Sequence, residues 1–141
     1  MIPAAVFDTN VLVAGFLSPT GPPGRLVEWL RGGGVQAVLD DRIVAEYREV
    51  LLRPAFGLPA KEVDEVLAAI TRRARWVQPG IRDMTSTGLP DPDDAPFLEC
   101  ARAAEVPLVT DNLRHFPRSV AGDVLILTPA RFLERLRGEP G

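Results

Sequence analysis

Near its N-terminus the chain reads Ala4-Ala5-Val6-Phe7-Asp8-Thr9-Asn10-Val11-Leu12-Val13. The run from Ala4 to Phe7 predicts a short buried strand, and an Asp-Thr-Asn triplet then interrupts the apolar residues. A carboxylate among apolar neighbours is costly to bury unless it finds a partner. We therefore expect the rest of the fold, or something bound to it, to neutralise the charge of Asp8.

Short apolar strands alternate with helical patterns along the rest of the chain. Further strands are predicted at residues 35–39, 76–77, 106–109 and 124–127. Helices are predicted at residues 25–31, from near Asp41 to a point before Pro54, at about 60–75 and 92–104, and at 129–137. Gly32-Gly33-Gly34 is predicted to end the first of these helices with a left-handed glycine, and residues 79–90 are predicted to form a loop. The alternation is typical of an α/β fold with a parallel sheet that is covered on both faces. The length predicts a single domain, residues 1–141.

The composition narrows the class of protein and the kind of site. Of the 141 residues, 46% are hydrophobic and 25% are charged, as in soluble globular proteins. Cys100 and His115 are the only residues of their types, which excludes an intrachain disulfide and argues against a zinc site. No apolar run approaches the roughly 20 residues that span a membrane, and no secretion signal is evident, so we expect a cytoplasmic protein. The net charge of −3 argues against binding nucleic acid by bulk positive charge.

Acidic residues are predicted to converge at one edge of the sheet. Asp8 follows the first strand, and Thr110-Asp111-Asn112 follow the strand of residues 106–109 in the same way. Sites in open parallel sheets form outside the carboxyl ends of the strands. Glu46 projects from the edge of the buried face of its helix, and Asp94 lies on the core-facing side of the next predicted helix start.

Each of these positions also has an ordinary structural explanation. Glu46 can pair with Arg42 on the helix surface, Asp94 belongs to a helix start rich in Asp and Pro, and Asp111 or Asn112 can form a turn. Taken together, however, like charges within a few Å require raised pKa values or a bound cation. Oxygen ligands without His or Cys favour Mg²⁺ or Mn²⁺.

Four motifs occur in a fixed order over nearly the whole chain. They are Phe7-Asp8-Thr9-Asn10-Val11-Leu12-Val13, the helix around Glu46, Asp91-Pro92-Asp93-Asp94 with Phe97-Leu98-Glu99-Cys100-Ala101, and Leu108-Val109-Thr110-Asp111-Asn112 with His115-Phe116-Pro117. Each motif is weakly specific, but the ordered set resembles PIN-domain nucleases. More narrowly, it resembles the PIN-family toxins of bacterial and archaeal toxin–antitoxin pairs.

The resemblance implies a three-layer α/β/α PIN-like fold with a central parallel sheet. It also implies metal-dependent hydrolysis of RNA phosphodiester bonds, with Asp8, Glu46 and Asp94 in the first three acidic positions of the family. Asp8 and Asp94 are expected to hold the principal Mg²⁺ or Mn²⁺, and Glu46 to hold a second ion or orient the attacking water. The donors expected to fix these carboxylates are Thr9, Asn10 and Thr110.

The fourth acidic position of the family falls within Thr110-Asp111-Asn112. It usually follows the Thr by two residues, as Asp or Asn, which favours Asn112. Strand alternation agrees, because Thr110 and Asn112 point to one side and Asp111 to the other. A turn or bulge could bring Asp111 inward instead, so both residues stay candidates for the catalytic set, and the number of metal ions stays open at one or two.

The resemblance further implies an RNA substrate, a cognate antitoxin protein and a homodimer. The alternative is a catalytically degenerate PIN module that binds RNA or a protein partner. A dehalogenase-like phosphohydrolase would need a second Asp where Asn10 stands, and a receiver domain would need a Lys near the last strand, whereas the only Lys is Lys61. The sequence does not specify the RNA target or the antitoxin.

Overall fold

The computed structural model describes residues 2–84 and 88–138 of the chain. Within these residues, five parallel strands form one sheet in the order β3-β2-β1-β4-β5. The strands are β1 (Ala4–Phe7), β2 (Gln36–Leu39), β3 (Arg75–Trp76), β4 (Leu108–Val109) and β5 (Ile126–Leu127). The central strand β1 therefore lies between a strand that follows it closely in the sequence and one that comes about a hundred residues later.

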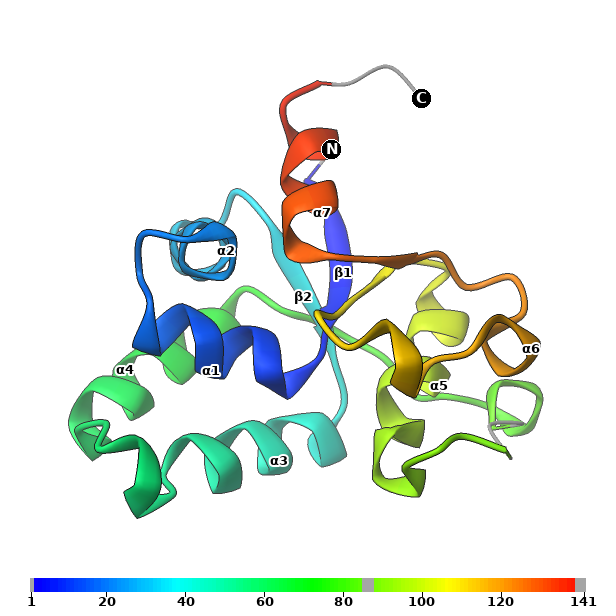
Figure 1. Ribbon diagram of the computed structural model, residues 1–141, viewed down its shortest axis with the longest axis horizontal. Coiled ribbons are helices and arrows are strands. Elements are labelled where there is room, and N and C mark those ends of the chain that lie inside the picture. Colours follow the sequence, from blue (N-terminus) through cyan, green and yellow to red (C-terminus); the bar gives the residue numbers. More distant parts are fainter. Residues whose placement is uncertain (1, 85–87, 139–141) are drawn as a thin grey trace.

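Helices cover both faces of this sheet. Figure 1 shows α1, α2 and α4 on one side of β1 and β2, and α5 and α6 on the other. This arrangement confirms the predicted three-layer α/β/α fold. The helices of the described residues are α1 (Thr9–Leu17), α2 (Pro22–Gly32), α3 (Asp41–Leu51), α4 (Ala60–Arg72), α5 (Ala95–Ala104), α6 (Arg118–Ala121) and α7 (Pro129–Leu136), with 3₁₀ turns η1 (Pro54–Phe56), η2 (Ile81–Asp83), η3 (Pro92–Asp94) and η4 (Leu113–His115).

The register of the strands aligns their carboxyl ends. Phe7, the last residue of β1, pairs with Val109 at the end of β4. On the other side of β1, Ala5 pairs with Ala37 of β2. Because all the strands are parallel, the residues that follow them leave the sheet at one common edge, which we call the carboxyl edge. The side chains of Ala5 and Phe7 in β1 are buried: their exposed fractions are both 0%.

The helix α1 was not predicted from the sequence. Its residues are apolar on nearly every side, so the helical repeat of polar and apolar positions is missing. In the structure, Val11 and Leu12 are fully buried and α1 packs against both α2 and α3. The burial of most of its surface explains the lack of an amphipathic pattern. The chain therefore turns from strand to helix directly at Asp8.

The remaining predicted elements are present with shifted ends. The helix predicted over residues 60–75 ends at Arg72, and the strand that follows begins one residue early, at Arg75. As predicted, a glycine in the left-handed conformation follows α2, namely Gly33 with φ of 84°. The predicted loop of residues 79–90 contains η2, and its residues 85–87 lie outside the described part of the chain. Among residues 2–84 and 88–138, no helix has the length and apolar character to cross a membrane.

Candidate metal centre

Asp8 lies at the point where β1 meets α1, and its side chain is almost fully enclosed. Its exposed fraction is 3%. Its backbone N–H donates to the carbonyl oxygen of Val109 at 2.9 Å, which fixes the residue against β4. Burial raises the pKa of the Asp8 carboxyl, and hydrogen bonds from Thr110 and the nearby backbone oppose this shift only in part. The carboxylate of Asp8 therefore carries a desolvation cost in the metal-free protein.

Thr110 connects the two strand ends that form the centre of the site. Its hydroxyl donates to Oδ2 of Asp8 at 2.7 Å and accepts a hydrogen bond from the backbone N–H of Asn112 at 2.9 Å. Its exposed fraction is 0%. Because both the donor and the acceptor capacity of this hydroxyl are used, Thr110 fixes the Asp8 carboxylate and the turn after β4 together.

Glu46 reaches the same edge of the sheet from α3 and is half-buried. The hydroxyl of Thr9 donates to Oε2 of Glu46. The next residue, Tyr47, is buried and donates its hydroxyl hydrogen to the carbonyl oxygen of Phe7. Two contacts therefore tie this part of α3 to the end of β1 and the start of α1. Burial raises the pKa of Glu46, and the negative charge of Asp8 raises it further.

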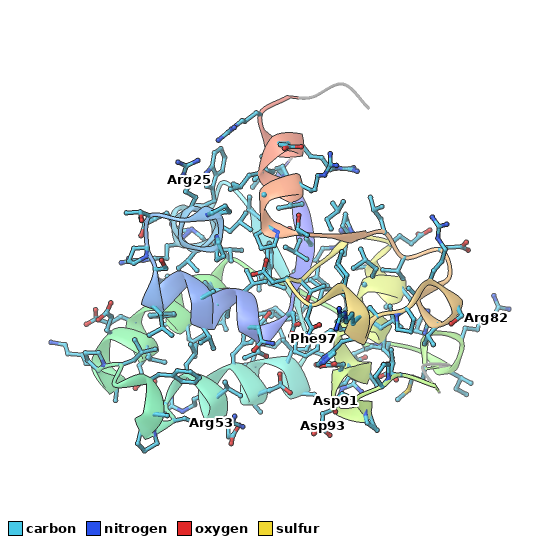
Figure 2. The ribbon with its side chains drawn as sticks, viewed as in Figure 1. Arg25, Arg53, Arg82, Asp91, Asp93 and Phe97 are labelled. Carbon is cyan, nitrogen blue, oxygen red and sulfur yellow. The ribbon has the colours of Figure 1, made fainter. Side chains whose placement is uncertain are left out.

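Asp94 comes from η3, at the start of α5, and has an exposed fraction of 8%. The capping role in this turn belongs to Asp91, whose side chain accepts a hydrogen bond from the backbone N–H of Asp93 at 3.0 Å. Burial and the charges of Asp8 and Asp91 raise the pKa of Asp94 to about 6. Figure 2 shows Asp91 and Asp93 at the lower end of the molecule, below Phe97 of α5.

The predicted residues thus occupy distinct places around the carboxyl edge. Asp8, Glu46 and Asp94 influence one another electrostatically, since the charge of Asp8 raises the pKa of the other two carboxyls. Two predicted donors, Thr9 and Thr110, hydrogen-bond to these carboxylates through their hydroxyl groups. The predicted donor Asn10 has an exposed side chain, and only its backbone stabilises the Asp8 carboxylate. After β4, Asp111 is exposed and Asn112 is half-buried.

Two residues of this region were not predicted to belong to the site. Nδ1 of His115 lies 2.9 Å from Oδ2 of Asp94. Asp91, Asp94 and His115 each offer one ligand atom, and these atoms all lie within 4.8 Å of one another. The sequence signal for His115 was its place in the turn after β4, three residues beyond Asn112. Asp91 belongs to the Asp91-Pro92-Asp93-Asp94 motif, in which only Asp94 is predicted to be a metal ligand.

The donor set suits a hard divalent cation. Asp8 and Glu46 do not belong to the group of Asp91, Asp94 and His115 whose ligand atoms lie within 4.8 Å of one another. However, Asp8, Glu46 and Asp94 are partly or largely buried and the charge of Asp8 acts on the other two, so a cation among them would stabilise all three. Oxygen ligands are those that Mg²⁺ and Mn²⁺ prefer. The basic group beside the carboxylates is His115, which hydrogen-bonds to one of the three, Asp94. The alternative pairing of Glu46 with Arg42 does not occur, because Arg42 binds other acids.

Arg42 lies beside the acidic site and joins α3 to α5. Its guanidinium donates to Oδ2 of Asp40 at 2.8 Å and to Oε1 of Glu99 at 2.7 Å. Asp40 also caps α3, accepting from the backbone N–H of Ile43 at 3.0 Å. These bonds raise the pKa of Arg42 although its burial opposes the shift. The network therefore fixes the helix that carries Glu46 against the helix that follows Asp94.

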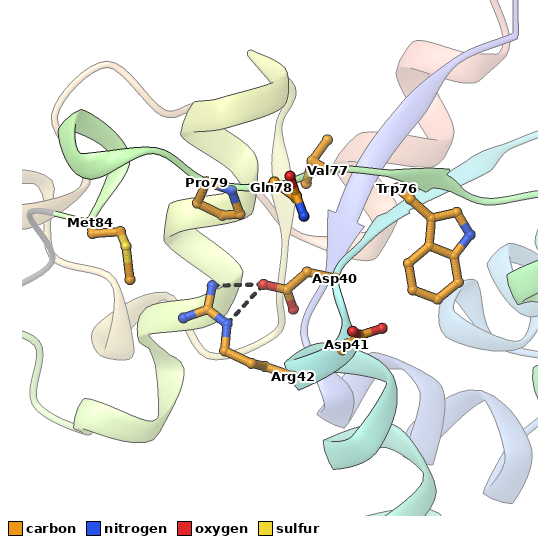
Figure 3. Close-up of a pocket in the computed structure, with 8 residues that line it drawn as sticks. All are labelled: Asp40, Asp41, Arg42, Trp76, Val77, Gln78, Pro79 and Met84. Atoms are coloured by element: carbon orange, nitrogen blue, oxygen red, sulfur yellow. Dashed lines mark hydrogen bonds and ion pairs between the residues drawn. The ribbon is translucent and has the colours of Figure 1, made fainter.

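An open pocket of about 930 Å³ lies at the ends of β2 and β3, and Asp40 and Arg42 of this network line it. Figure 3 shows Arg42 bound to Asp40 within it, with Met84 on one side and Trp76 on the other. None of the three clustered carboxylates lines this pocket. The pocket therefore does not enclose the candidate metal centre.

The raised pKa of Asp94 predicts a pH dependence for the metal-free protein. We expect stability to rise as the pH falls from about 7.5 to about 5, because the folded protein takes up a proton at Asp94 that the unfolded chain, with its lower carboxyl pKa, does not. Asp94→Asn should show a smaller rise over the same range. Thermal unfolding in EDTA at several pH values measures both slopes, and equal slopes for the two proteins would contradict the prediction.

Comparison with known proteins identifies the family of the chain. The family model described as PIN domain matches residues 4–114, which is most of the chain. The chain therefore belongs to the PIN domain family, as its sequence motifs suggested.

A solved structure shares the fold over nearly its whole length. This chain is similar to a chain in the crystal structure of VapBC2 from Rickettsia felis bound to a DNA fragment from the VapBC2 promoter. The TM-score is 0.59 and the sequence identity is 12%. The similarity covers 89% of this chain and 98% of that chain. At this identity the likeness concerns the fold. No curated protein matches the chain.

Proposed function

We propose that this protein is a metal-dependent endoribonuclease that hydrolyses RNA phosphodiester bonds. The observation that carries the proposal is the burial of Asp8 and Asp94 beside Glu46, with the pKa of each carboxyl raised. A fold does not stabilise such a cluster without a gain elsewhere, and perturbed carboxyls that converge at a strand edge are typical of active sites. Membership of the PIN domain family, whose members are generally nucleases, supports the same reading.

Asp8 and Asp94 would hold the principal Mg²⁺ or Mn²⁺ through carboxylate oxygens. A bound ion of this kind lowers the pKa of water and neutralises charge that develops on the phosphate. Glu46 would hold a second ion or orient the attacking water. Thr9 and Thr110 keep the Glu46 and Asp8 carboxylates in place through their hydroxyl groups, so the ligand geometry is set before substrate arrives.

The direct test is cleavage of single-stranded RNA by the purified protein. We expect cleavage with Mg²⁺ or Mn²⁺ and no cleavage with EDTA, because the three carboxylates supply no charge stabilisation of their own to the phosphate. Restoring the metal after chelation should restore the activity. RNA binding without cleavage at any metal concentration would overturn the proposal and favour the alternative of a catalytically degenerate PIN module.

We further propose that the protein acts as the toxin of a toxin–antitoxin pair. The support is the fold that it shares with a chain from the VapBC2 structure, together with its PIN domain motifs. The partner would then be a cognate antitoxin protein that covers the acidic residues at the carboxyl edge. Such a partner can supply Arg or Lys side chains to the clustered carboxylates, which would replace the charge of the metal.

We propose that Asn112, in preference to Asp111, completes the acidic site. Asn112 is half-buried and held by Thr110, whereas the side chain of Asp111 is exposed. We expect Asn112→Ala to reduce cleavage at limiting Mn²⁺ by about tenfold more than Asp111→Ala, as for groups that support metal ligands. Initial cleavage rates of the two variants at equal concentration decide the matter. If Asp111→Ala is the inactive variant, the site contains four acids.

A further inference from the structure

His115 contacts the candidate metal centre from a segment distant in the sequence. It is the last residue of η4, the 3₁₀ turn after β4, and its side chain is 34% exposed. Its Nδ1 atom lies 2.9 Å from Oδ2 of Asp94, at the start of α5. It is also the only histidine of the chain. The contact therefore joins the turn after β4 to the turn that precedes α5.

The direction of this hydrogen bond follows from the chemistry of its partners. While Asp94 is ionised, its carboxylate only accepts hydrogen bonds, so Nδ1 of His115 carries the hydrogen and donates it to Asp94. In the neutral imidazole the other nitrogen, Nε2, then has no hydrogen. A donor fixed on one oxygen of a carboxylate restricts the rotation of the whole group.

We infer that His115 is a positioning residue for Asp94, holding Oδ2 so that the remaining carboxylate oxygen faces the metal. The inference rests on the proposed function, because it concerns the same metal centre. The geometry that carries it is the short Nδ1–Oδ2 contact, formed by a half-buried ring that also lies close to Asp91. Loss of such a supporting hydrogen bond typically lowers metal affinity by about 10-fold to 100-fold.

Two substitutions separate the positioning role from a merely space-filling one. In His115→Asn the side-chain amide nitrogen can occupy the place of Nδ1 and donate to Asp94, whereas in His115→Gln the amide extends to the place of Nε2. We expect His115→Gln to weaken Mn²⁺ binding by about tenfold or more and His115→Asn to retain most of the affinity. Arg114→Gln, on the same turn and exposed, should leave the affinity unchanged.

The affinity is measured by titrating the full-length metal-free protein with Mn²⁺ and following the free ion by electron paramagnetic resonance. Thermal unfolding in EDTA reports whether each variant is folded. Because the chain has one histidine, its imidazole ¹⁵N signals are unambiguous, and we expect them to show hydrogen on Nδ1 in the unsubstituted protein. This signature tests the hydrogen bond even if a variant does not fold.

The outcomes separate the inference from the proposed function. Equal Mn²⁺ affinity in all the variants would overturn the role of His115 and leave the metal centre standing. Equal loss in His115→Asn and His115→Gln would also overturn it, since the ring would then act as a ligand or a spacer. Hydrogen on Nε2 alone would do the same. Failure of the unsubstituted protein to bind Mn²⁺ would overturn the metal centre, and the inference with it.

Discussion

Replacement of Asp8 by asparagine is expected to reduce RNA cleavage by about a thousand-fold, because a metal-ligating carboxylate supplies several kcal/mol of transition-state stabilisation. The metal-free variant should be as stable as the unsubstituted protein or more stable. Burial disfavours the charged form of Asp8, and asparagine has no charge to bury. Its amide oxygen can still accept the hydroxyl hydrogen of Thr110. Cleavage rates with Mn²⁺ and thermal unfolding in EDTA measure the two effects.

Asp123→Asn provides the matched control, because Asp123 is exposed and follows α6, away from the acidic edge. It should change neither measurement.

Expression of the protein alone should impair the growth of cells, and Asp8→Asn should restore it, if the protein is a toxin. Cleavage that survives Asp8→Asn would contradict the proposed site. Cleavage without impaired growth would indicate a role in RNA processing.

The second large effect is expected at Arg42, where substitution by methionine should destabilise the protein. It would leave the carboxylates of Asp40 and Glu99 without their shared partner, and their exposed fractions are 9% and 5%. Breaking a fully buried pair costs roughly 3–5 kcal/mol, but the Arg42 side chain is 41% exposed, so we expect a loss of about 2 kcal/mol. Urea-induced unfolding measures the free energy.

Arg48→Met is the control for this prediction. Arg48 pairs with Asp64 on the surface, where the two side chains are 57% and 45% exposed, and loss of such a pair should cost about 0.5 kcal/mol or less. Adding Glu99→Gln to Arg42→Met should recover part of the lost stability, because it removes one uncompensated charge. If Arg42→Met and Arg48→Met were equally mild, the network of Asp40, Arg42 and Glu99 would have no special role.

Much of the architecture could be predicted from local patterns in the sequence. Four of the five strands, all except β3 (Arg75–Trp76), lie in short apolar runs, and the amphipathic helices α2, α3 and α4 carry apolar residues at helical spacing. The parallel arrangement followed from the alternation of strands and helices. The helix α1 escaped prediction because a helix enclosed by α2 and α3 has no polar face. Its apolar residues were consistent with a strand as well as with a helix.

Site residues could be predicted from the sequence only where their place in a strand or helix determined which way the side chain points. Asp8 and Thr110 each follow a strand, so their meeting at the carboxyl edge could be expected. The bond from His115 to Asp94 and the bond from Arg42 to Glu99 depend on how distant segments pack. The helical repeat of the sequence indicates only pairs within one helix. It therefore suggests Glu46, one helical turn away, as the partner of Arg42.

The order of the strands determines how late in synthesis the candidate metal centre can assemble. Asp8 is translated well before its hydroxyl donor Thr110 and its neighbouring strand β4, which follow about a hundred residues later. A nascent chain that ends before β4 lacks both, and it lacks the turn that carries His115. If the protein cleaves RNA as proposed, this late assembly would prevent the unfinished polypeptide from cleaving the message from which it is being made.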